Sequence, residues 1–334
     1  MRRIGVSFFS YASKLVIIGI SLLVTLITRA QVPATTVLVP QCAQPPQQVD
    51  HATFTTAQLA RYGLPQRRSG ESLAHWQQVV RAAKNRVCQG QLGKLTHHPL
   101  VSPRATTTAT VSDEEYTNWA GNIANAYGYT EAVGEWTVPC LSLLLHDDGA
   151  SAWVGLGGSR NDGGGNLVQA GTSSLEYSDF PGHWYATYAA WIEDYPNDPT
   201  DVIAFSVNCG ATMYADVWQD YTNGNPVRAN MFISDWSSGQ YWSAYNTQAL
   251  ANASTAEWIV ERGNANSGNL ANFHSVHFTG CYAVRYGTTN SPINLPHNYS
   301  TMIWNGDTLA RVGPLYGDQN DSWANFTVNW VASH

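Results

Sequence analysis

Lysine is scarce in this 334-residue chain, and none follows Lys94. Residues 111–334 contain five arginines and 22 acidic residues, a net charge of −17, whereas residues 31–110 carry +6. Proteins that bind nucleic acid need a basic surface for its phosphates, so the acidic segment argues against a nucleic-acid partner. The opposite charges of the two segments predict instead that they attract each other at neutral pH.

Common catalytic signatures are also missing. The sequence has no G-x-S-x-G, no H-E-x-x-H, no P-loop and no Cys-His signature. His274 and His277 are three residues apart, which on a strand places them on opposite faces, so we expect no metal site there. We also expect no cofactor. A free cysteine nucleophile is an open alternative, but thiolates are scarce at acid pH.

The longest apolar run is at the N-terminus. Arg2 and Arg3 precede an apolar stretch over residues 15–27, and Ala30 follows it. This pattern is typical of a secretory signal peptide, here residues 1–30. A retained membrane anchor is the alternative, although the stretch is shorter than the ~20 residues of a span. We therefore expect a secreted, extracellular protein with no stable membrane association after signal removal.

Export would allow disulfides. The five cysteines fall into two groups, Cys42 and Cys88 before residue 111 and Cys140, Cys209 and Cys281 after it. A bridge within the first pair would keep the groups separate, but a sequence does not reveal the pairing.

Residues 31–110 have the character of a basic pro-segment. A short helix is predicted over 56–62, capped by Thr55, and a longer one with a single apolar stripe over 69–88. The small polar residues 103–112 predict an exposed, protease-sensitive linker. We expect an inhibitory or chaperoning intramolecular partner that is shed at low pH. A retained helical accessory domain is the alternative.

Residues 111–334 predict an all-β domain. Residues that favour strands gather in short runs divided by Gly, Asn and Pro, a pattern typical of a sandwich of two sheets. Residues 202–213 and 215–221 suit a hairpin, and 161–165 a tight turn. The other expected strands are 129–139, 151–158, 166–173, 185–195, 231–236, 255–260, 276–283 and 326–331.

The stretch Ala256-Glu-Trp-Ile-Val-Glu261 sets carboxylates into an apolar run. Side chains alternate along a strand, so Glu257 and Glu261 share one face and Trp258 lies on the other. A carboxylate in such a run is costly unless it is solvated, paired or used in chemistry. Taken alone, Glu257 is most simply a structural or solvated group.

Gln169 lies among small and apolar residues beside Gly171. Its amide donates two hydrogen bonds and carries no charge, so it suits a role in stabilising an oxyanion. Paired with a glutamate that activates water, it could hydrolyse an amide. Taken alone, it is more simply a strand residue whose hydrogen bonds are made by its neighbours.

Six segments in this order make the chain resemble the glutamic peptidases, also called eqolisins, over roughly residues 116–334. They are Asn118-Trp-Ala-Gly121, Val133-Gly-Glu-Trp-Thr-Val-Pro139, Ala152-Trp-Val-Gly155, Gln169-Ala-Gly171, Ala190-Trp-Ile-Glu193 with Tyr195-Pro196, and Ala256-Glu-Trp-Ile-Val-Glu261. Each is weak alone, and their shared order gives the resemblance its strength.

The resemblance implies a concanavalin A-like (jelly-roll) sandwich of two antiparallel sheets with a catalytic Gln and Glu on a concave face. Gln169 matches the family's Gln-x-Gly context, and Glu257 matches Ala-Glu-Trp-Ile-Val-Glu. Four further residues lie in segments that resemble the lining of the substrate cleft: Trp153, Trp191, Glu193 and Tyr195.

The chain also departs from the fungal pattern. Gly157 stands where an Asp is often found, and Ser173 where one can occur. Subsite preference and the supporting hydrogen bonds are therefore open. The long basic pro-segment with Gly63-Leu-Pro65 is similar to that of bacterial members, so the chain reads as a bacterial-type preproprotein.

The implied activity is that of a pepstatin-insensitive acid endopeptidase acting on proteins and peptides, and we expect a monomer. A glutamate of ordinary pKa, about 4.3, stays ionised in mild acid and can act as the base. Two rivals fit the same fold: a glycoside hydrolase that uses Glu193 and Glu257, and a carbohydrate-binding module that stacks sugars on Trp191 and Tyr195. Neither explains Gln169 or the basic pro-segment.

Overall fold

The computed structural model describes residues 42–68, 70–88, 93–95, 113–146, 148–159, 166–179, 182–195, 202–223, 225–247, 254–262, 269–317 and 323–333. The expected signal peptide (1–30), linker (103–112) and tight turn (161–165) lie outside these residues. Within the described ranges, no helix combines the length and the apolar character needed to cross a bilayer.

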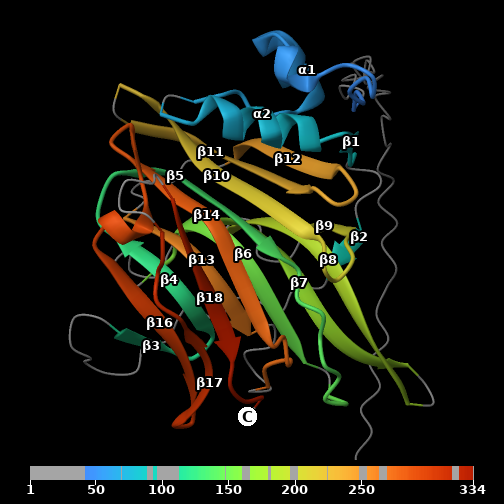
Figure 1. The fold of residues 1–334 in the computed structure, drawn as a ribbon, viewed down its shortest axis with the longest axis vertical. Coiled ribbons are helices and arrows are strands. Elements are labelled where there is room, and N and C mark those ends of the chain that lie inside the picture. The colour runs from blue at the N-terminus through green and yellow to red at the C-terminus, as the bar shows by residue number, and fades with distance from the viewer. Residues whose placement is uncertain are drawn as a thin grey trace, which may run out of the picture. The chain divides into compact units, whose positions relative to one another are not determined.

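The strands form two layers (Figure 1). Layer one is a ladder whose neighbours are hydrogen-bonded, and its strands are antiparallel except for the pair β16–β3. In spatial order it contains β2 (Gly93–Leu95), β9 (Val202–Ser206), β8 (His183–Tyr195), β7 (Leu167–Asp179), β6 (Gly149–Gly157), β13 (Thr255–Arg262), β4 (Trp119–Asn125), β16 (His297–Trp304) and β3 (Asp113–Tyr116).

Layer two continues from β16 without a break, because β17 pairs with both β16 and β18. Its pairs are antiparallel except for the last, β12–β1. In order it contains β17 (Asp307–Val312), β18 (Ala324–Trp330), β14 (Ser275–Arg285), β5 (Tyr129–Thr137), β10 (Thr212–Thr222), β11 (Asn225–Asp235), β12 (Gln240–Thr247) and β1 (Asn85–Arg86), with β15 (Thr288–Asn290) beside β14.

The main core lies between the layers. Trp258 and Val260 of β13 face inward with Val154 of β6, against residues of layer two such as Val217. Two indole groups join the layers: Trp258 Nε1 donates to Val133 O over 2.7 Å, and Trp136 Nε1 donates to Thr172 Oγ1 over 2.9 Å. The predicted all-β sandwich is confirmed, with its two sheets joined into one continuous ladder.

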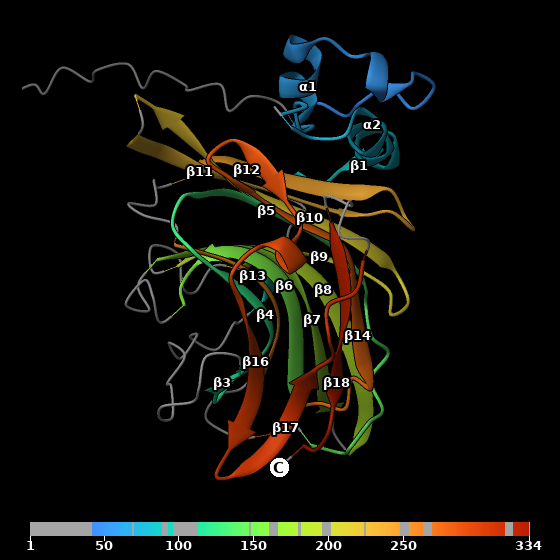
Figure 2. The ribbon, with the colours of Figure 1, turned by 60° about the vertical axis from the view of Figure 1, so that its left-hand side comes forward.

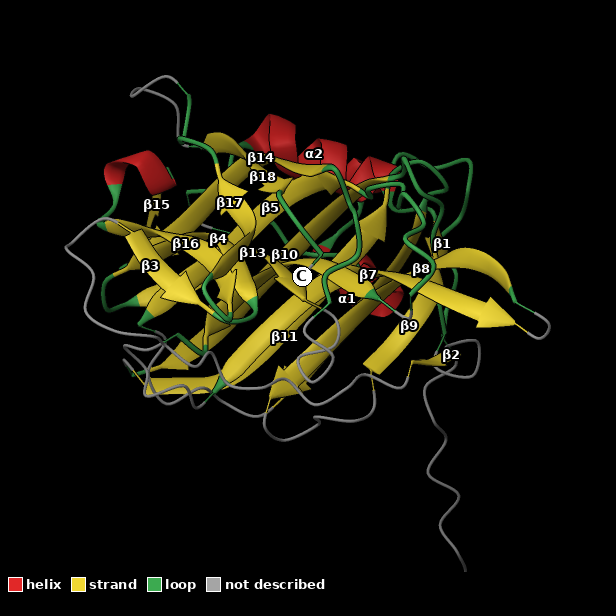
Figure 3. Ribbon diagram, turned by 90° about the horizontal axis from the view of Figure 1, so that it is seen from below, coloured by secondary structure: helices red, strands yellow, loops and turns green. Residues whose placement is uncertain are grey.

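Residues 42–88 pack on the outer face of layer two, and we call them the cover. They contain η1 (His51–Thr53), α1 (Thr56–Tyr62), α2 (Leu73–Ala82) and β1. Figure 2 shows layer two between the helices and the strands β6, β7 and β13 of layer one, and Figure 3 shows the same layers from below. The cover therefore lies on the opposite side of layer two from layer one.

The first predicted helix is confirmed at both ends. Thr55 caps α1 in a capping box with Gln58, and Gly63 ends it in the left-handed region at a φ of 66°. The second prediction, over 69–88, was too long: α2 begins after Ser72 and ends at Ala82. The chain beyond it instead pairs with β12 as β1, an interaction with residues far away in the sequence.

The hairpin expected between 202–213 and 215–221 is wrong. β9 pairs with β8 in layer one, whereas β10 pairs with β11 and β5 in layer two. The intervening residues carry the chain between the layers, and Cys209 there is bonded to Cys140. A second disulfide joins Cys42 to Cys88 within the cover, and Cys281 is buried as a free thiol.

Candidate active site

One row of residues crosses four paired strands of layer one. Glu257 of β13 is paired with Gly155 of β6, Gly155 with Gln169 of β7, and Gln169 with Glu193 of β8. Paired residues of antiparallel strands point to the same face. The backbones of Glu257 and Gln169 lie two strand spacings apart, about 10 Å. Gly155 has no side chain of its own, and a Cβ there would lie 2.9 Å from Trp153 Cζ3 and 3.0 Å from Leu167 Cδ1.

Glu193 holds the amide of Gln169. Gln169 Nε2 donates to Glu193 Oε2 over 2.7 Å, and both residues are buried. A primary amide has two N–H groups, so the second remains available for a reacting oxygen. The 24 residues that separate the two in the sequence form the β7–β8 hairpin, which brings them face to face.

Gln169 and Glu257 are both fully buried, with 0% of their surface exposed. A polypeptide substrate therefore does not reach them in the full-length chain as it stands. The cover is not the reason, since it lies on layer two.

Tryptophans form the next row of the same face. Trp153 of β6 is paired with Gly171 of β7, and Gly171 with Trp191 of β8. A Cβ at Gly171 would lie 2.5 Å from Trp153 Cβ and 2.8 Å from Trp191 Cζ2. Glycine is needed here because the indole side chains occupy the space beside its backbone. Together with Tyr195, which packs against the same apolar cluster, the two tryptophans surround the row of Gln169.

Glu261 lies two residues along the same face of β13 from Ile259. Trp153 Nε1 donates to its Oε2 over 2.9 Å, and Asn118 Nδ2 donates to its Oε1 over 3.0 Å. Burial raises the pKa of Glu261 to about 8, and these donors act in the opposite direction. The carboxyl group therefore holds its proton in acid and neutral solution, and it fixes the ring of Trp153.

Comparison with known proteins fits this geometry. Residues 117–318, more than half of the chain, match the model of the Peptidase A4 family. The chain belongs to this family, the glutamic peptidases. It is 27% identical to aspergillopepsin-2 of Aspergillus niger over 206 residues, which are 55% of this chain and 70% of that protein.

The fold is also that of a solved glutamic peptidase. Scytalido-glutamic peptidase, in a crystal structure with a peptide-based transition state analog, superposes with a TM-score of 0.50 at 20% identity. The superposition covers 64% of this chain and 98% of that one. The rest of this chain, outside the superposition, is long enough to contain the cover and the residues that precede it.

The six segments that carried the resemblance come together in this glutamic peptidase. Five lie on or beside β4, β6, β7, β8 and β13, which are consecutive in layer one. The remaining segment, Val133-Gly-Glu-Trp-Thr-Val-Pro139, lies in layer two behind them, where Val133 accepts the hydrogen bond from Trp258. A Cβ at Gly134 would approach Trp258 Cδ1 to 2.8 Å, so that segment must be small where β13 packs on it.

The structure accounts for both departures from the fungal pattern, at Gly157 and at Ser173. Gly157 has a φ of 84°, a conformation that favours glycine over aspartate. Ser173 forms a hydrogen bond of 2.8 Å with Ser151, its partner across the β6–β7 pair. A neutral hydroxyl pair thus lies where the fungal pattern can carry a carboxylate.

The glycoside hydrolase alternative leaves Gln169 without a role. Gln169 lies in the row between Glu193 and Glu257, and its Nε2 donates to Glu193 Oε2 over 2.7 Å. Among the described residues, no group of three or more His, Cys, Asp and Glu side chains could hold a metal ion.

Sequence reasoning gave Asn118 and Trp119 no function. The structure places Asn118 against Glu261, and Trp119 edge-on to Trp153 at 5.0 Å between ring centroids. The only sign of a function in the sequence was that both residues lie in a segment shared with the family. The sequence did not reveal their contacts, because β4 pairs with β13 across more than 130 residues.

Proposed function

We propose that this glutamic peptidase is a secreted, pepstatin-insensitive acid endopeptidase in which Glu257 activates water and Gln169 stabilises the oxyanion. The observation that carries the proposal is the row that joins Glu257 to Gln169 across Gly155. It supports a shared task because a carboxylate and an amide lie on the same face of the sheet, in one row, on either side of a residue without a side chain.

In the proposed reaction, ionised Glu257 takes a proton from a water molecule, whose oxygen attacks the scissile carbonyl carbon. The carbonyl oxygen becomes an oxyanion and accepts a hydrogen bond from the second N–H of Gln169. Protonated Glu257 then gives its proton to the leaving nitrogen as the C–N bond breaks. The base is thereby restored, and the products are a carboxylic acid and an amine.

Peptide is the proposed substrate class. The matched structure of scytalido-glutamic peptidase holds a peptide-based transition state analog. In this chain, Trp153, Trp191 and Tyr195 offer large apolar surfaces beside the proposed dyad, and Glu193 offers a carboxylate. We propose these four residues as the lining that binds substrate side chains.

Latency is part of the proposal. The burial of Gln169 and Glu257 supports synthesis in a form that is inactive at full length. We propose that residues 1–30 direct its export and that residues 31–110 form its pro-segment. The proposed site holds a Glu/Gln pair instead of the two aspartates of aspartic peptidases. We therefore expect its proteolysis to resist pepstatin.

The test is hydrolysis of denatured casein and of β-glucan at about pH 4, with and without pepstatin, by acid-treated protein. We expect pepstatin-resistant proteolysis and no glucan hydrolysis. Gln169→Ala should lower the rate by about 10²–10³, and Glu257→Ala should abolish practical turnover. Asp179→Asn, at the exposed end of β7, is the matched control and should retain full activity.

Urea unfolding of each variant separates loss of chemistry from loss of fold. A purified, folded Glu257→Gln protein with full proteolytic activity would refute the proposed base. Glucan hydrolysis that depends on Glu193 and Glu257 would select the glycosidase instead.

A further inference from the structure

We propose that the cover, residues 42–88, is a lasting part of the folded protein, and that cleavage between the cover and β3 gives a two-chain protein held together without a covalent bond. This reverses the expectation that the whole pro-segment is shed. It rests on how the cover packs and is independent of the proposed dyad chemistry.

The first argument is the shared apolar core between the cover and layer two. Large side chains of both parts pack into one cluster. Burying one such side chain contributes about 1.5–3 kcal/mol, and soluble monomers rarely expose a contiguous patch of this kind. From the cover the cluster takes Phe54, Leu59, Leu64, Trp76, Val79, Val80 and Ala83; from layer two it takes Val133, Tyr214, Trp218, Phe232, Tyr241, Tyr282 and Val284.

The second argument is that the cover completes the sheet. β1 pairs with β12, and the backbone N–H groups of Lys84 and Asn85 both donate to Gly239 O over 2.8 Å. Val87 N donates to Tyr241 O over 2.8 Å. Removing the cover would expose the backbone of Gln240 and Tyr241 at the start of β12 as an open strand edge, which proteins otherwise protect.

The third argument is a partly buried cation that pairs with two buried carboxylates. The guanidinium of Arg68 forms hydrogen bonds of 2.8 and 2.9 Å with Glu131, contacts Asp216, and lies 4.3 Å from the ring centroid of Trp218. The side chains of Glu131 and Asp216 are only 4% and 1% exposed. Without Arg68, two carboxylates on adjacent strands would face each other with no cation between them.

Acidification does not act through Asp216 to expel the cover. Burial raises the pKa of Asp216 well above its usual range, and Arg68 opposes this. A carboxyl group whose pKa is higher in the docked state binds its proton more readily there, so its contribution to docking grows as pH falls. Burial raises the pKa of Glu71 in the same direction. The other titratable groups around Arg68 and these acids are Glu131, Tyr214, Tyr245, Tyr282 and His75.

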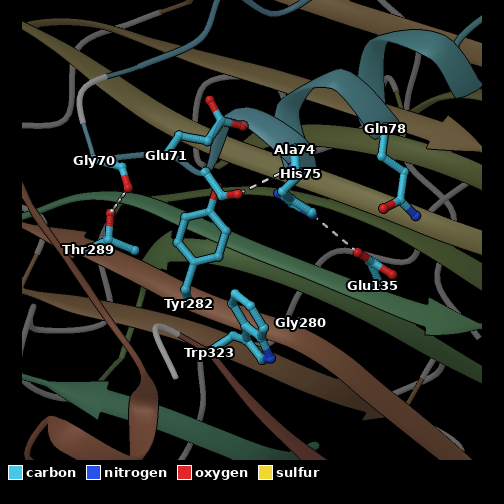
Figure 4. A pocket seen from close by; sticks show the side chains of 11 residues that line it. Gly70, Glu71, Ala74, His75, Gln78, Glu135, Gly280, Tyr282, Thr289 and Trp323 are labelled. Atoms are coloured by element: carbon cyan, nitrogen blue, oxygen red, sulfur yellow. Dashed lines mark hydrogen bonds and ion pairs between the residues drawn. The ribbon is translucent and has the colours of Figure 1, made fainter. Parts of the chain in front are cut away.

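One end of the contact is open. A cavity of about 630 Å³ lies between the start of α2 and strands β5 and β14. Figure 4 shows His75 pointing from α2 toward Glu135 of β5, and the two side chains lie 3.3 Å apart. Thr289 Oγ1 donates to Gly70 O at the same end over 3.1 Å. Polar contacts thus continue the interface where the apolar packing ends.

The cysteines make the association noncovalent. One disulfide joins Cys42 to Cys88 inside the cover, and the other joins Cys140 to Cys209 inside the remaining chain. Cys281 is a free buried thiol. None of these three, which account for all five cysteines, links the two parts after cleavage.

The test begins with the folded full-length protein carrying a recognition sequence for a site-specific protease between Gly90 and Gln91, so that the cut separates the cover from β2, which pairs with β9 of layer one. After cutting, size-exclusion chromatography at pH 7 and at pH 4 follows the cover. We expect the cover to co-elute with residues 113–334 at both pH values, and to separate in urea without reductant. Elution of a free cover at either pH under native conditions would overturn the proposal.

Two variants of the cut protein sharpen the result. Trp76→Ala removes a buried ring from the interface, whereas Leu73→Ala removes an apolar side chain from the exposed face of the same helix. Trp76→Ala should weaken retention of the cover at least tenfold, and Leu73→Ala should leave it unchanged. Equal effects of the two would contradict a docking role for this face. Because the readout is co-elution, it holds whether or not the proposed peptidase chemistry is right.

Discussion

Gln169 and Glu193 are joined by a hydrogen bond of 2.7 Å, from the amide Nε2 to the carboxylate Oε2 across the β7–β8 pair. The bond fixes which way the amide points, because its N–H groups must face the acceptor. If Gln169 stabilises the oxyanion, Glu193 positions the amide of Gln169 without itself contacting the reacting atoms.

Two replacements of Glu193 therefore test whether its oxygen acceptor or its negative charge is needed to position the amide of Gln169. Glu193→Leu removes the acceptor at similar volume, and we expect kcat on a peptide substrate to fall at least tenfold with a smaller change in KM. Glu193→Gln keeps an oxygen acceptor and should retain most of kcat. Steady-state kinetics of both variants give the answer. A change confined to KM would show that Glu193 only binds substrate.

Gly171→Ala tests the space beside the tryptophans. The new Cβ would lie 2.5 Å from Trp153 Cβ and 2.6 Å from Ala152 O, so backbone and side chain must both shift. We expect a loss of about 1–3 kcal/mol in the free energy of unfolding and lower activity as the indoles move. Gly313→Ala is the matched control, because its nearest contact is 3.4 Å. Equal losses of unfolding free energy in the two variants, measured with urea, would contradict the proposed crowding.

Glu261→Gln tests the raised pKa of that carboxyl. The folded protein keeps the proton up to about pH 8, whereas an unfolded chain releases it near pH 4.5. The folded state then binds more protons in this window, so Glu261 makes stability fall as pH rises, by up to about 1.4 kcal/mol per pH unit. In Glu261→Gln this part of the slope should vanish. Unfolding curves between the two pH values, compared with the unaltered protein, measure it.

Arg68→Met tests the cation that the cover places beside Glu131 and Asp216. The substitution leaves Glu131 and Asp216 buried without their partner, and removing one member of such a pair costs about 3–5 kcal/mol. We expect a loss of this size in the free energy of unfolding at pH 7. Arg81→Gln is the control, since its pair with Asp50 is exposed and its loss should not be detectable. An unaltered midpoint for Arg68→Met would mean that the pair contributes nothing net.

Local patterns in the sequence predicted those parts of the fold that depend on neighbours in the chain. Thr55 and Gly63 define α1, and the alternation around Glu257 gives the faces of β13. The length of α2 and the place of β10 depend on β12, β11 and β5, which lie far away in the sequence. Periodicity carries no information about such partners.

The candidate site, like the fold, was predictable from the sequence only in part. Gln169 and Glu257 could be singled out because polar residues in apolar strands need a reason. The row that joins Glu257 to Gln169 across Gly155 and the hydrogen bond from Gln169 to Glu193 could not, because both depend on the register of three strand pairs. For Glu261, the sequence suggested support of the cleft, and the contact with Trp153 gives that suggestion a physical form.

Lys84, at the end of α2, has an exposed side chain while its backbone is tied to Gly239. Since residues 111–334 contain no lysine, reagents that acylate side-chain amines leave that whole segment unmarked. A fluorophore or biotin coupled to side-chain amines would mark Lys84 in the cover and Lys94 in β2, and chemical cross-linkers that join two lysines cannot bridge the cover to residues 111–334. Coupling through side-chain amines can therefore be used to follow, immobilise or remove the part of the protein that precedes residue 111.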